Sequence, residues 1–356
     1  MAKIEKHNFL QLFEKFIRDS DSGRRLQKSG KRLSKGTIGN YRYLLKLLID
    51  FQMKKEFPLI IQSSNRLNKR EFITEKKYWK KFYKEFTNFL YNDLGCFDNY
   101  VGSNMKMLRT FFNYLNNDLG FYIGNSHKNF YVRKEEIPVI VLTPEQLNFL
   151  IFDKEFETSL SERLLRTKDI FVFGCTVALR ISDLMQLKFQ NLELIGENYY
   201  LKVHSKKTQT YTRIKLPGYA IDIIKKYKRK QKTLLPYISI FNLNKNIRLL
   251  MEASGWTQVC TKTRWKRGMI LPVYKNQNSG EPYRFCDLVS SHTMRRTAIT
   301  SMLSLGMPEH LVRKISGHAA NSKEFFRYVA LSQLYVDAET ETMFQKLEQR
   351  TLFKVA

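Results

Sequence analysis

Cysteines are few in this sequence and none are arranged in pairs. Cys96, Cys175, Cys260 and Cys286 are the four cysteines among 356 residues, and no two of them form a CxxC motif. This spacing excludes the common zinc-binding motifs and provides no disulfide framework. We therefore expect reduced thiols, as is usual for a protein of the cytoplasm.

Long hydrophobic runs are also missing. The opening stretch, "MAKIEKHNFLQLFEKF", has charged residues in every turn. A secretory signal needs an uninterrupted apolar core, and a membrane span needs about 20 apolar residues. We expect neither, and no membrane partner.

Acidic residues are scarce relative to basic ones. The chain has 61 Lys and Arg against 33 Asp and Glu, which gives a formal charge of +28 at pH 7. Such an excess favours a polyanionic partner, with nucleic acid the leading candidate. Hydrophobic residues make up 43% of the chain, which excludes a disordered basic tail. The length suits two domains of ordinary size.

The first part of the chain has helical periodicity almost throughout. We predict a helical DNA-binding domain over residues 1–131, a linker over 132–142, and a second domain over 143–356. Apolar residues recur at three- and four-residue spacing in three segments of the first domain. They are Ile38, Tyr41, Leu45 and Leu48; Trp79, Phe82, Phe86, Phe89 and Leu90; and Met105, Leu108, Phe112 and Leu115. Their spacing favours core packing over stacking on bases.

The second domain reads as mainly helical with a small sheet. Thr143 and Pro144 give a helix start, and "TVALRISDL" indicates a buried helix followed by a break that holds Arg180. The stretch "NYYLKVHSKKTQTYTRIKLPG" alternates between apolar and polar residues, which predicts a β-hairpin whose turn carries Lys206 and Lys207.

The stretch "SSHTMRRTAIT" predicts a helix with a cap-like start at Ser291. His292 and Arg295 are three residues apart, so both project from the first turn. That turn also exposes backbone N–H groups and the positive end of the helix dipole, which together suit an anion such as phosphate. Alone, a pair this short more often represents a helix cap and a surface arginine.

Four segments in order make the pattern specific. They are "VALRISDL", "SKKTQTYTRIKL", "SHTMRRTAIT" and "SGHAANSKEFFRY". This set resembles the tyrosine recombinases, the phage integrase family of mobile-element integrases. The resemblance implies a mainly α fold, with a helical N-terminal core-binding domain and a mixed, mainly helical catalytic domain that holds a small antiparallel β-sheet.

The resemblance also implies the site. Its catalytic residues would be Arg180, Lys207, His292, Arg295, His318 and Tyr328. The arginines would bind the non-bridging oxygens of the scissile phosphate, for which a planar guanidinium is suited. The histidines would donate hydrogen bonds or move protons, the lysine would protonate the leaving 5′ oxygen, and the tyrosine would be the nucleophile. Lys206 is the alternative to Lys207, because a hairpin can slip by one residue.

The activity implied is site-specific cleavage and rejoining of DNA through a 3′-phosphotyrosine, without metal, cofactor or ATP. Its partners would be double-stranded DNA with specific recombination sites, three further copies in a synaptic tetramer, and in some systems DNA-bending accessory proteins. The setting would be the bacterial cytoplasm, in association with the nucleoid. A type IB topoisomerase and a noncatalytic DNA-binding factor are the rivals.

The sequence departs from the family pattern in three places. Arg296 replaces a common histidine, Met294 replaces a common leucine, and the interval from His318 to Tyr328 is one residue longer than usual. Tyr335 is a competing nucleophile, although it lies further from His318 than the pattern favours.

Overall fold

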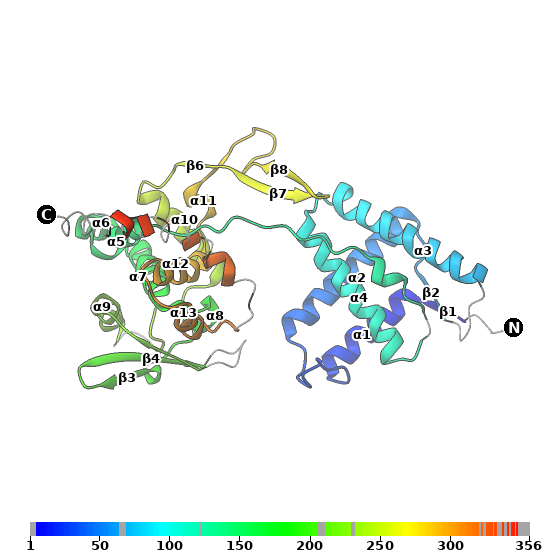
Figure 1. Ribbon diagram of the computed structural model, residues 1–356, viewed down its shortest axis with the longest axis horizontal. Helices are drawn as coiled ribbons and strands as arrows, with labels where there is room; N and C mark the ends of the chain where they lie inside the picture. Colours follow the sequence, from blue (N-terminus) through cyan, green and yellow to red (C-terminus); the bar gives the residue numbers. More distant parts are fainter. Residues whose placement is uncertain are drawn as a thin grey trace. The chain divides into compact units, whose positions relative to one another are not determined.

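The computed structural model divides the chain into two compact units (Figure 1). One consists of Met1–Ile137 and Thr263–Val273, and the other of Pro138–Lys262 and Tyr274–Ala356. The structure describes residues 5–63, 69–121, 123–204, 211–228, 232–319, 322, 325–329, 331–332, 337, 340–341, 343–345 and 347.

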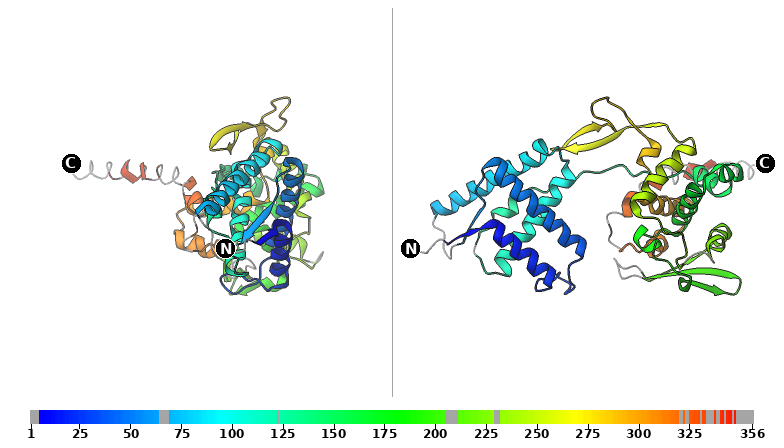
Figure 2. Two further views of the ribbon diagram at one scale, coloured as in Figure 1. Left: turned by 90° about the vertical axis from the view of Figure 1, so that its right-hand side faces the viewer. Right: turned by 180° about the vertical axis from the view of Figure 1, so that it is seen from behind.

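The first unit is a helical bundle, coloured blue to cyan in Figure 2. Its helices are α1 (Phe9–Ser22), α2 (Lys35–Lys55), α3 (Lys69–Asn88), the π-helical turn η1 (Phe89–Asp93), α4 (Asp98–Asn117) and the 3₁₀ turn η2 (Ser126–Asn129). Strands β1 (Glu5–Asn8) and β2 (Ile60–Ser63) pair antiparallel. The aromatic residues predicted to pack do so, because Trp79, Phe82 and Phe112 are all buried in one core.

Local signals in the sequence account for the helix ends of this unit. Ser34 caps α2, and its hydroxyl accepts a hydrogen bond from the Thr37 N–H at 3.2 Å. Gly95 and Gly120 follow η1 and α4 with φ of 65° and 67°. Glycine adopts this left-handed conformation without the steric cost that a side chain brings.

One hairpin of the first unit comes from the range predicted for the second domain. Strands β7 (Lys262–Lys266) and β8 (Met269–Val273) lie far along the chain, yet residues 263–273 pack with the first unit. The range 143–356 is therefore not one compact unit. The physical reason is two buried carboxylates of the first unit that accept hydrogen bonds from the hairpin. Periodicity cannot reveal such long-range pairing. The other change of unit, between Ile137 and Pro138, falls inside the expected linker.

The second unit is built around α7 (Glu162–Val177), which is buried along most of its length. Helices α5, α9, α10 and α12 pack against it. The bounds of the other helices are α5 (Pro144–Phe152), α6 (Lys154–Ser159), α8 (Ile181–Leu184), η3 (Phe189–Asn191), α9 (Gly218–Tyr227), α10 (Ile240–Ala253), α11 (Phe285–Leu288), α12 (Ser291–Ser304) and α13 (Glu309–Ser316). Thr143 caps α5 in a capping box with Gln146, as its sequence predicts.

A small antiparallel sheet lies beside these helices. Strands β3 (Leu192–Ile195), β4 (Asn198–His204) and β5 (Tyr211–Lys215) are neighbours in chain order. Leu201 and Val203 of β4 and Ile214 of β5 are buried, so one face of the predicted hairpin covers the core. Strands β6 (Val259–Cys260) and β9 (Tyr283–Arg284) form a second short pair.

The fold is thus mainly helical with small antiparallel sheets, as predicted. In the part of the chain that the structure describes, no helix is both long and apolar enough to cross a membrane.

Candidate active site

Arg180 lies in a sharp break between two helices. Helix α7 ends at Val177, and Ala178 turns the chain with a φ of +54°. Arg180 then stands in extended conformation before α8. The residues immediately before it, Ala178 and Leu179, are buried. The break therefore places a partly exposed guanidinium beside a rigid core.

Helix α12 holds Arg295 in the interior. The helix is capped one residue earlier than predicted, at Ser290, whose N–H donates to Thr293 Oγ1 at 3.1 Å. Arg295 is only 8% exposed, and its Nη1 donates to the carbonyl oxygen of Ala178 at 2.8 Å. His292, three residues before, is exposed. Although His292 and Arg295 both project from the first turn of α12, only Arg295 is buried.

The close approach of α7 and α12 depends on a glycine. A Cβ at Gly174 would lie 2.5 Å from Met294 Sδ and 3.0 Å from Met294 Cβ. Real side chains do not pack this closely. Gly174 therefore lets α12 come near enough to α7 for Arg295 to reach Ala178.

His318 is placed by the end of α13. Gly317 ends that helix with a φ of +64°, and the N–H of His318 donates to the carbonyl of Arg313 at 3.0 Å. A residue with a side chain would be strained at this φ. The glycine of the "SGH" stretch thus turns His318 back toward α12.

The hydrogen bonds of His318 indicate its tautomer. The hydroxyl of Ser316 donates to the carbonyl of Val312 at 2.7 Å, and Ser316 Oγ lies 2.8 Å from His318 Nδ1. Since the hydroxyl proton is already used, Nδ1–H donates to Ser316 Oγ. Nε2 then carries the lone pair and accepts from Arg295 Nη2 at 3.2 Å.

Tyr328 lies next to this histidine. Residues 325–329 are helical, and the ring centroids of Tyr328 and His318 are 5.9 Å apart. Tyr328 packs on a small core that also supports the arginines. Its members are Ala178, Ala298, Ile299, Val312 and Phe325. Residues from α7, α12, α13 and the following helical segment thus meet at one place.

The neighbouring cations shift the pKa values of Arg295 and His318. Burial and the neighbouring Arg180 lower the pKa of Arg295 to about 10, although Tyr328 and Asp183 act in the opposite direction. Burial lowers the pKa of His318 to about 3, and the charges of Arg295, Arg180 and Arg313 contribute. His318 is therefore neutral at pH 7. Concentrated positive charge of this kind favours binding of an anion.

The structure brings together four of the six residues predicted for the site, Arg180, Arg295, His318 and Tyr328. His292 lies on the first turn of α12, exposed. Lys207 and its alternative Lys206 lie outside the described residues. The strand that follows their turn contacts α13, where Thr212 Oγ1 donates to the carbonyl of Lys314 at 3.4 Å.

Sequence reasoning missed two supporting residues. Ser316 fixes the imidazole of His318, and Arg313 supports Phe325, since its guanidinium lies 4.0 Å from the centre of that ring. Arg313 Nε also donates to Glu309 Oε1 at 2.7 Å. The i,i+4 spacing of Glu309 and Arg313 was a usable signal for the ion pair. Nothing in the sequence pattern indicated the contact with the ring.

The described residues include no group of three or more His, Cys, Asp or Glu side chains placed to hold a metal ion. The polar groups that converge here are guanidinium, imidazole and phenol. These can bind and polarise an oxyanion, and the phenol can attack it.

Solved structures with this fold include three DNA recombinases in complex with DNA. The XerH site-specific recombinase in a post-cleavage complex with palindromic difH has a TM-score of 0.58 at 14% identity, with 92% of this chain and 90% of that chain covered. A lambda integrase dimer on a COC′ core site gives 0.55 at 13% identity, covering 91% and 77%. The Tn1549 transposon integrase with transposon right-end DNA gives 0.55 at 15% identity, covering 95% and 99%.

No protein of curated function matches the chain significantly. Residues 141–334, more than half of the chain, match the phage integrase family. That stretch contains the whole cluster of Arg180, Arg295, His318 and Tyr328. The chain therefore belongs to the phage integrase family, the tyrosine recombinases, which break and rejoin DNA strands.

Proposed function

We propose that this protein is a site-specific recombinase, an integrase of a mobile element, that cleaves DNA through a covalent 3′-phosphotyrosine formed by Tyr328. The observation that carries the proposal is the convergence of Arg180, Arg295 and His318 beside that tyrosine. These residues come from elements separated by well over a hundred positions in the chain. Packing alone gives no reason to gather so much positive charge in one place.

The chemistry follows from the charges. A phosphodiester resists attack because it is an anion, and its transition state carries more negative charge. Arg180 and Arg295 bind the non-bridging oxygens and neutralise that charge. One preorganised donor of this kind is typically worth about a hundredfold or more in rate.

Proton transfer accompanies the attack. Tyr328 Oη attacks phosphorus, the bond from phosphorus to the 5′ oxygen breaks, and Lys207 supplies the proton that the leaving oxygen takes up. A phenol is mostly protonated at neutral pH, because its ordinary pKa is about 10. The adjacent guanidinium groups stabilise the phenolate that forms as Tyr328 gives its proton to water during the attack. His292, exposed on the first turn of α12, donates to the phosphate when DNA is bound.

The phosphotyrosine keeps the energy of the broken bond. A 5′ hydroxyl from another strand can therefore attack it and release Tyr328 without ATP. This reversal permits strand exchange between two duplexes. The partners that we propose are double-stranded DNA with specific sites, a synaptic tetramer of this chain, and accessory DNA-bending proteins at some sites. The fold that the chain shares with DNA-bound recombinases supports a DNA partner.

The test is covalent trapping. Duplexes with random core sequences and a nick near the centre are incubated with the full chain, and SDS-stable adducts are isolated. We expect adducts from the wild type, a tryptic peptide with phosphotyrosine at position 328, and trapped DNA with one common junction. Tyr328→Phe should give none, and Tyr335→Phe, the matched control, should give as many as the wild type.

Two further outcomes separate the alternatives. Arg295→Ala should still bind the selected DNA in a gel shift but lose cleavage. A noncatalytic factor would give no adduct with any of these proteins. A topoisomerase would form the adduct but reseal only the same strand, so joining of two differently labelled duplexes distinguishes it from a recombinase. An adduct retained by Tyr328→Phe would overturn the assignment of the nucleophile.

A further inference from the structure

The segment between α10 and α11 leaves the second unit and returns to it. Its base is held in the second unit, where β6 pairs with β9 and Cys260 packs against the core. Its tip, residues 263–273, belongs to the first unit. The chain therefore passes between the units at three places, after Ile137, after Lys262 and after Val273.

The tip is a tight hairpin. Arg267 and Gly268 connect β7 to β8 with φ values of +56° and +82°. Positive φ at both central residues is the requirement of a two-residue type I′ turn. Such a turn presents consecutive N–H groups on its outer side, where they can bind an anion.

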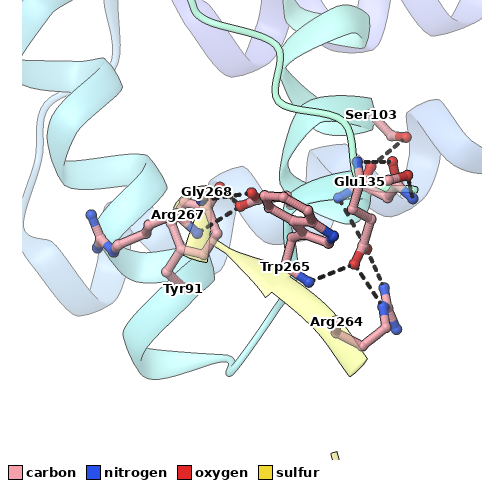
Figure 3. Close-up of polar contacts among 9 residues, drawn as sticks. Tyr91, Ser103, Glu135, Arg264, Trp265, Arg267 and Gly268 are labelled. Carbon is pink, nitrogen blue, oxygen red and sulfur yellow. Dashed lines mark hydrogen bonds and ion pairs between the residues drawn. The ribbon is translucent and has the colours of Figure 1, made fainter. Parts of the chain in front are cut away.

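Glu135 of the first unit holds one side of this hairpin. Its side chain is 0% exposed. It accepts hydrogen bonds from Arg264 Nε at 2.9 Å, Arg264 Nη2 at 2.6 Å and the N–H of Trp265 at 2.8 Å (Figure 3). Both carboxylate oxygens are used by a single guanidinium, which is a strong and directional arrangement. The hydrogen bonds outweigh the effect of burial and keep the pKa of Glu135 below its ordinary value.

Asp98, the first residue of α4, holds the turn itself. It accepts from the N–H of Arg267 at 2.8 Å and the N–H of Gly268 at 2.9 Å. It also accepts from the hydroxyl of Tyr91 at 2.6 Å, and the guanidinium of Arg267 lies 4.8 Å from the centre of the Tyr91 ring. Figure 3 shows a yellow strand of this hairpin among cyan helices of the first unit, beside the labelled Tyr91 and Glu135.

Both anchors are buried carboxylates, and their partners are supplied by the hairpin. Asp98 is 1% exposed and Glu135 is 4% exposed. A buried carboxylate that loses its donors is strongly destabilised. The docked hairpin therefore supplies most of the donors to these two carboxylates.

Glu135 stands at the point where the first unit ends. The next polar anchor along the chain is the N–H of Leu142, which donates to Thr297 Oγ1 at 3.0 Å in the second unit. Ile140, two residues earlier, already packs against the core of the second unit, so the free segment after Glu135 is about five residues long and can reach roughly 17 Å when extended. The route through the hairpin, from Cys260 to Arg264, is about four residues and can reach roughly 14 Å. With the hairpin docked, the shorter route sets the limit on separation.

We propose that the β7–β8 hairpin is a second tether that limits how far the two units can move apart, and that Glu135 and Asp98 act as positioning residues by keeping it docked. Undocking leaves only the longer linker between the units. In a DNA recombinase the tether keeps the first unit within reach of DNA that the second unit has bound. This last step rests on the proposed function, whereas the tether itself does not.

The first measurement uses the full chain without DNA. We expect Arg264→Met to raise hydrogen exchange of the amides in residues 262–273 at least tenfold and to leave α7 and α12 unchanged. Small-angle scattering should show a larger maximum dimension and a broader distance distribution. Arg166→Met is the matched control, because Arg166 forms an exposed ion pair with Glu162 on α7. It should change neither readout.

A second variant removes the concern that Arg264→Met fails to fold. Combining it with Glu135→Gln makes both partners neutral while an acceptor for the Trp265 N–H remains. We expect the same rise in exchange and the same broadening. Unchanged exchange in residues 262–273 for both variants would overturn the docking, and raised exchange without broadening would overturn the tether.

The third measurement uses DNA selected by the trapping experiment. Loss of the tether should raise the DNA dissociation rate about tenfold. It should change single-turnover cleavage of saturated complexes by less than twofold, because Arg180, Arg295 and Tyr328 all belong to the second unit. A larger effect on cleavage than on dissociation would contradict a positioning role. If the wild type cleaves no DNA yet the scattering result holds, the proposed function fails and the tether stands.

Discussion

Replacement of Arg295 by methionine tests whether the site is strained without its anion. Arg295 is buried beside Arg180, and its pKa is lowered from 12.5 to about 10. A shift of one pKa unit corresponds to about 1.4 kcal/mol, so keeping this guanidinium charged costs the free protein about 3 kcal/mol. Methionine fills a similar volume and carries no charge.

The replacement also has a cost. The carbonyl of Ala178 loses the donor that Arg295 Nη1 supplies at 2.8 Å, and an unsatisfied buried acceptor costs about 1–3 kcal/mol. Nε2 of His318 loses its donor as well, but this imidazole is only half-buried and can accept from water instead. The two effects nearly cancel. We therefore expect Arg295→Met to leave the free energy of unfolding unchanged or to raise it by up to about 2 kcal/mol. DNA cleavage should fall at least a hundredfold.

The assay is urea unfolding at low ionic strength, followed by hydrogen exchange in α7 and α12, because the two units need not unfold together. Inorganic phosphate in millimolar amounts should stabilise the wild type and should stabilise the variant much less. Arg166→Met is the control for loss of an exposed charge. If Arg295→Met lowers the free energy of unfolding by more than about 2 kcal/mol without phosphate, the reasoning is refuted.

Three further predictions concern packing, pH and orientation. Gly174→Ala should lower the free energy of unfolding by about 1–3 kcal/mol, because the new Cβ meets Met294. Met294→Ala in the same chain should recover part of this loss in urea unfolding. If it recovers none, another contact is responsible. Burial raises the pKa of Glu75 to about 7, so this carboxyl binds more protons in the folded protein than in the unfolded chain between pH 4.5 and 7. Its contribution to stability should fall by up to about 3 kcal/mol as the pH rises through this range. Burial lowers the pKa of His127 to about 4 and gives a slope of the opposite sign, so the measurement is the difference between the wild type and Glu75→Gln; the same slope in both proteins would exclude a contribution from Glu75. Ser316→Ala should remove the partner of His318 Nδ1, change the tautomer seen by ¹⁵N NMR and slow cleavage about tenfold without weakening DNA binding; an unchanged tautomer would contradict the hydrogen-bond assignment.

The elements that local rules govern were predictable from the sequence. Ser34 and Thr143 cap their helices because their side chains accept hydrogen bonds from nearby N–H groups. The apolar faces of α2, α3 and α4 are buried because a helical repeat places them on one side. The alternating stretch after Asn198 forms β4 and β5 for the corresponding reason in strands.

The candidate site was predictable only as a list of residues. The four quoted segments identified Arg180, Arg295, His318 and Tyr328 through a family resemblance, and the structure brings them together. Their unequal burial was not predictable, because Arg295 is buried by α7 packing across Gly174, a contact distant in sequence. The roles of the individual residues remain proposals. The docking of residues 263–273 was also beyond prediction, since Asp98 and Arg267 are separated by 169 positions.

That separation has a consequence for synthesis on the ribosome. The helices of the first unit are complete once Ile137 has emerged, but the donors for Glu135 and Asp98 are translated more than a hundred residues later. At about 5–20 residues per second, these carboxylates wait on the order of ten seconds for their partners. During that interval Asp98 keeps the Tyr91 hydroxyl as a donor, but both carboxylates lack the donors of the hairpin, so the docked arrangement can form only after residues 263–273 have been translated.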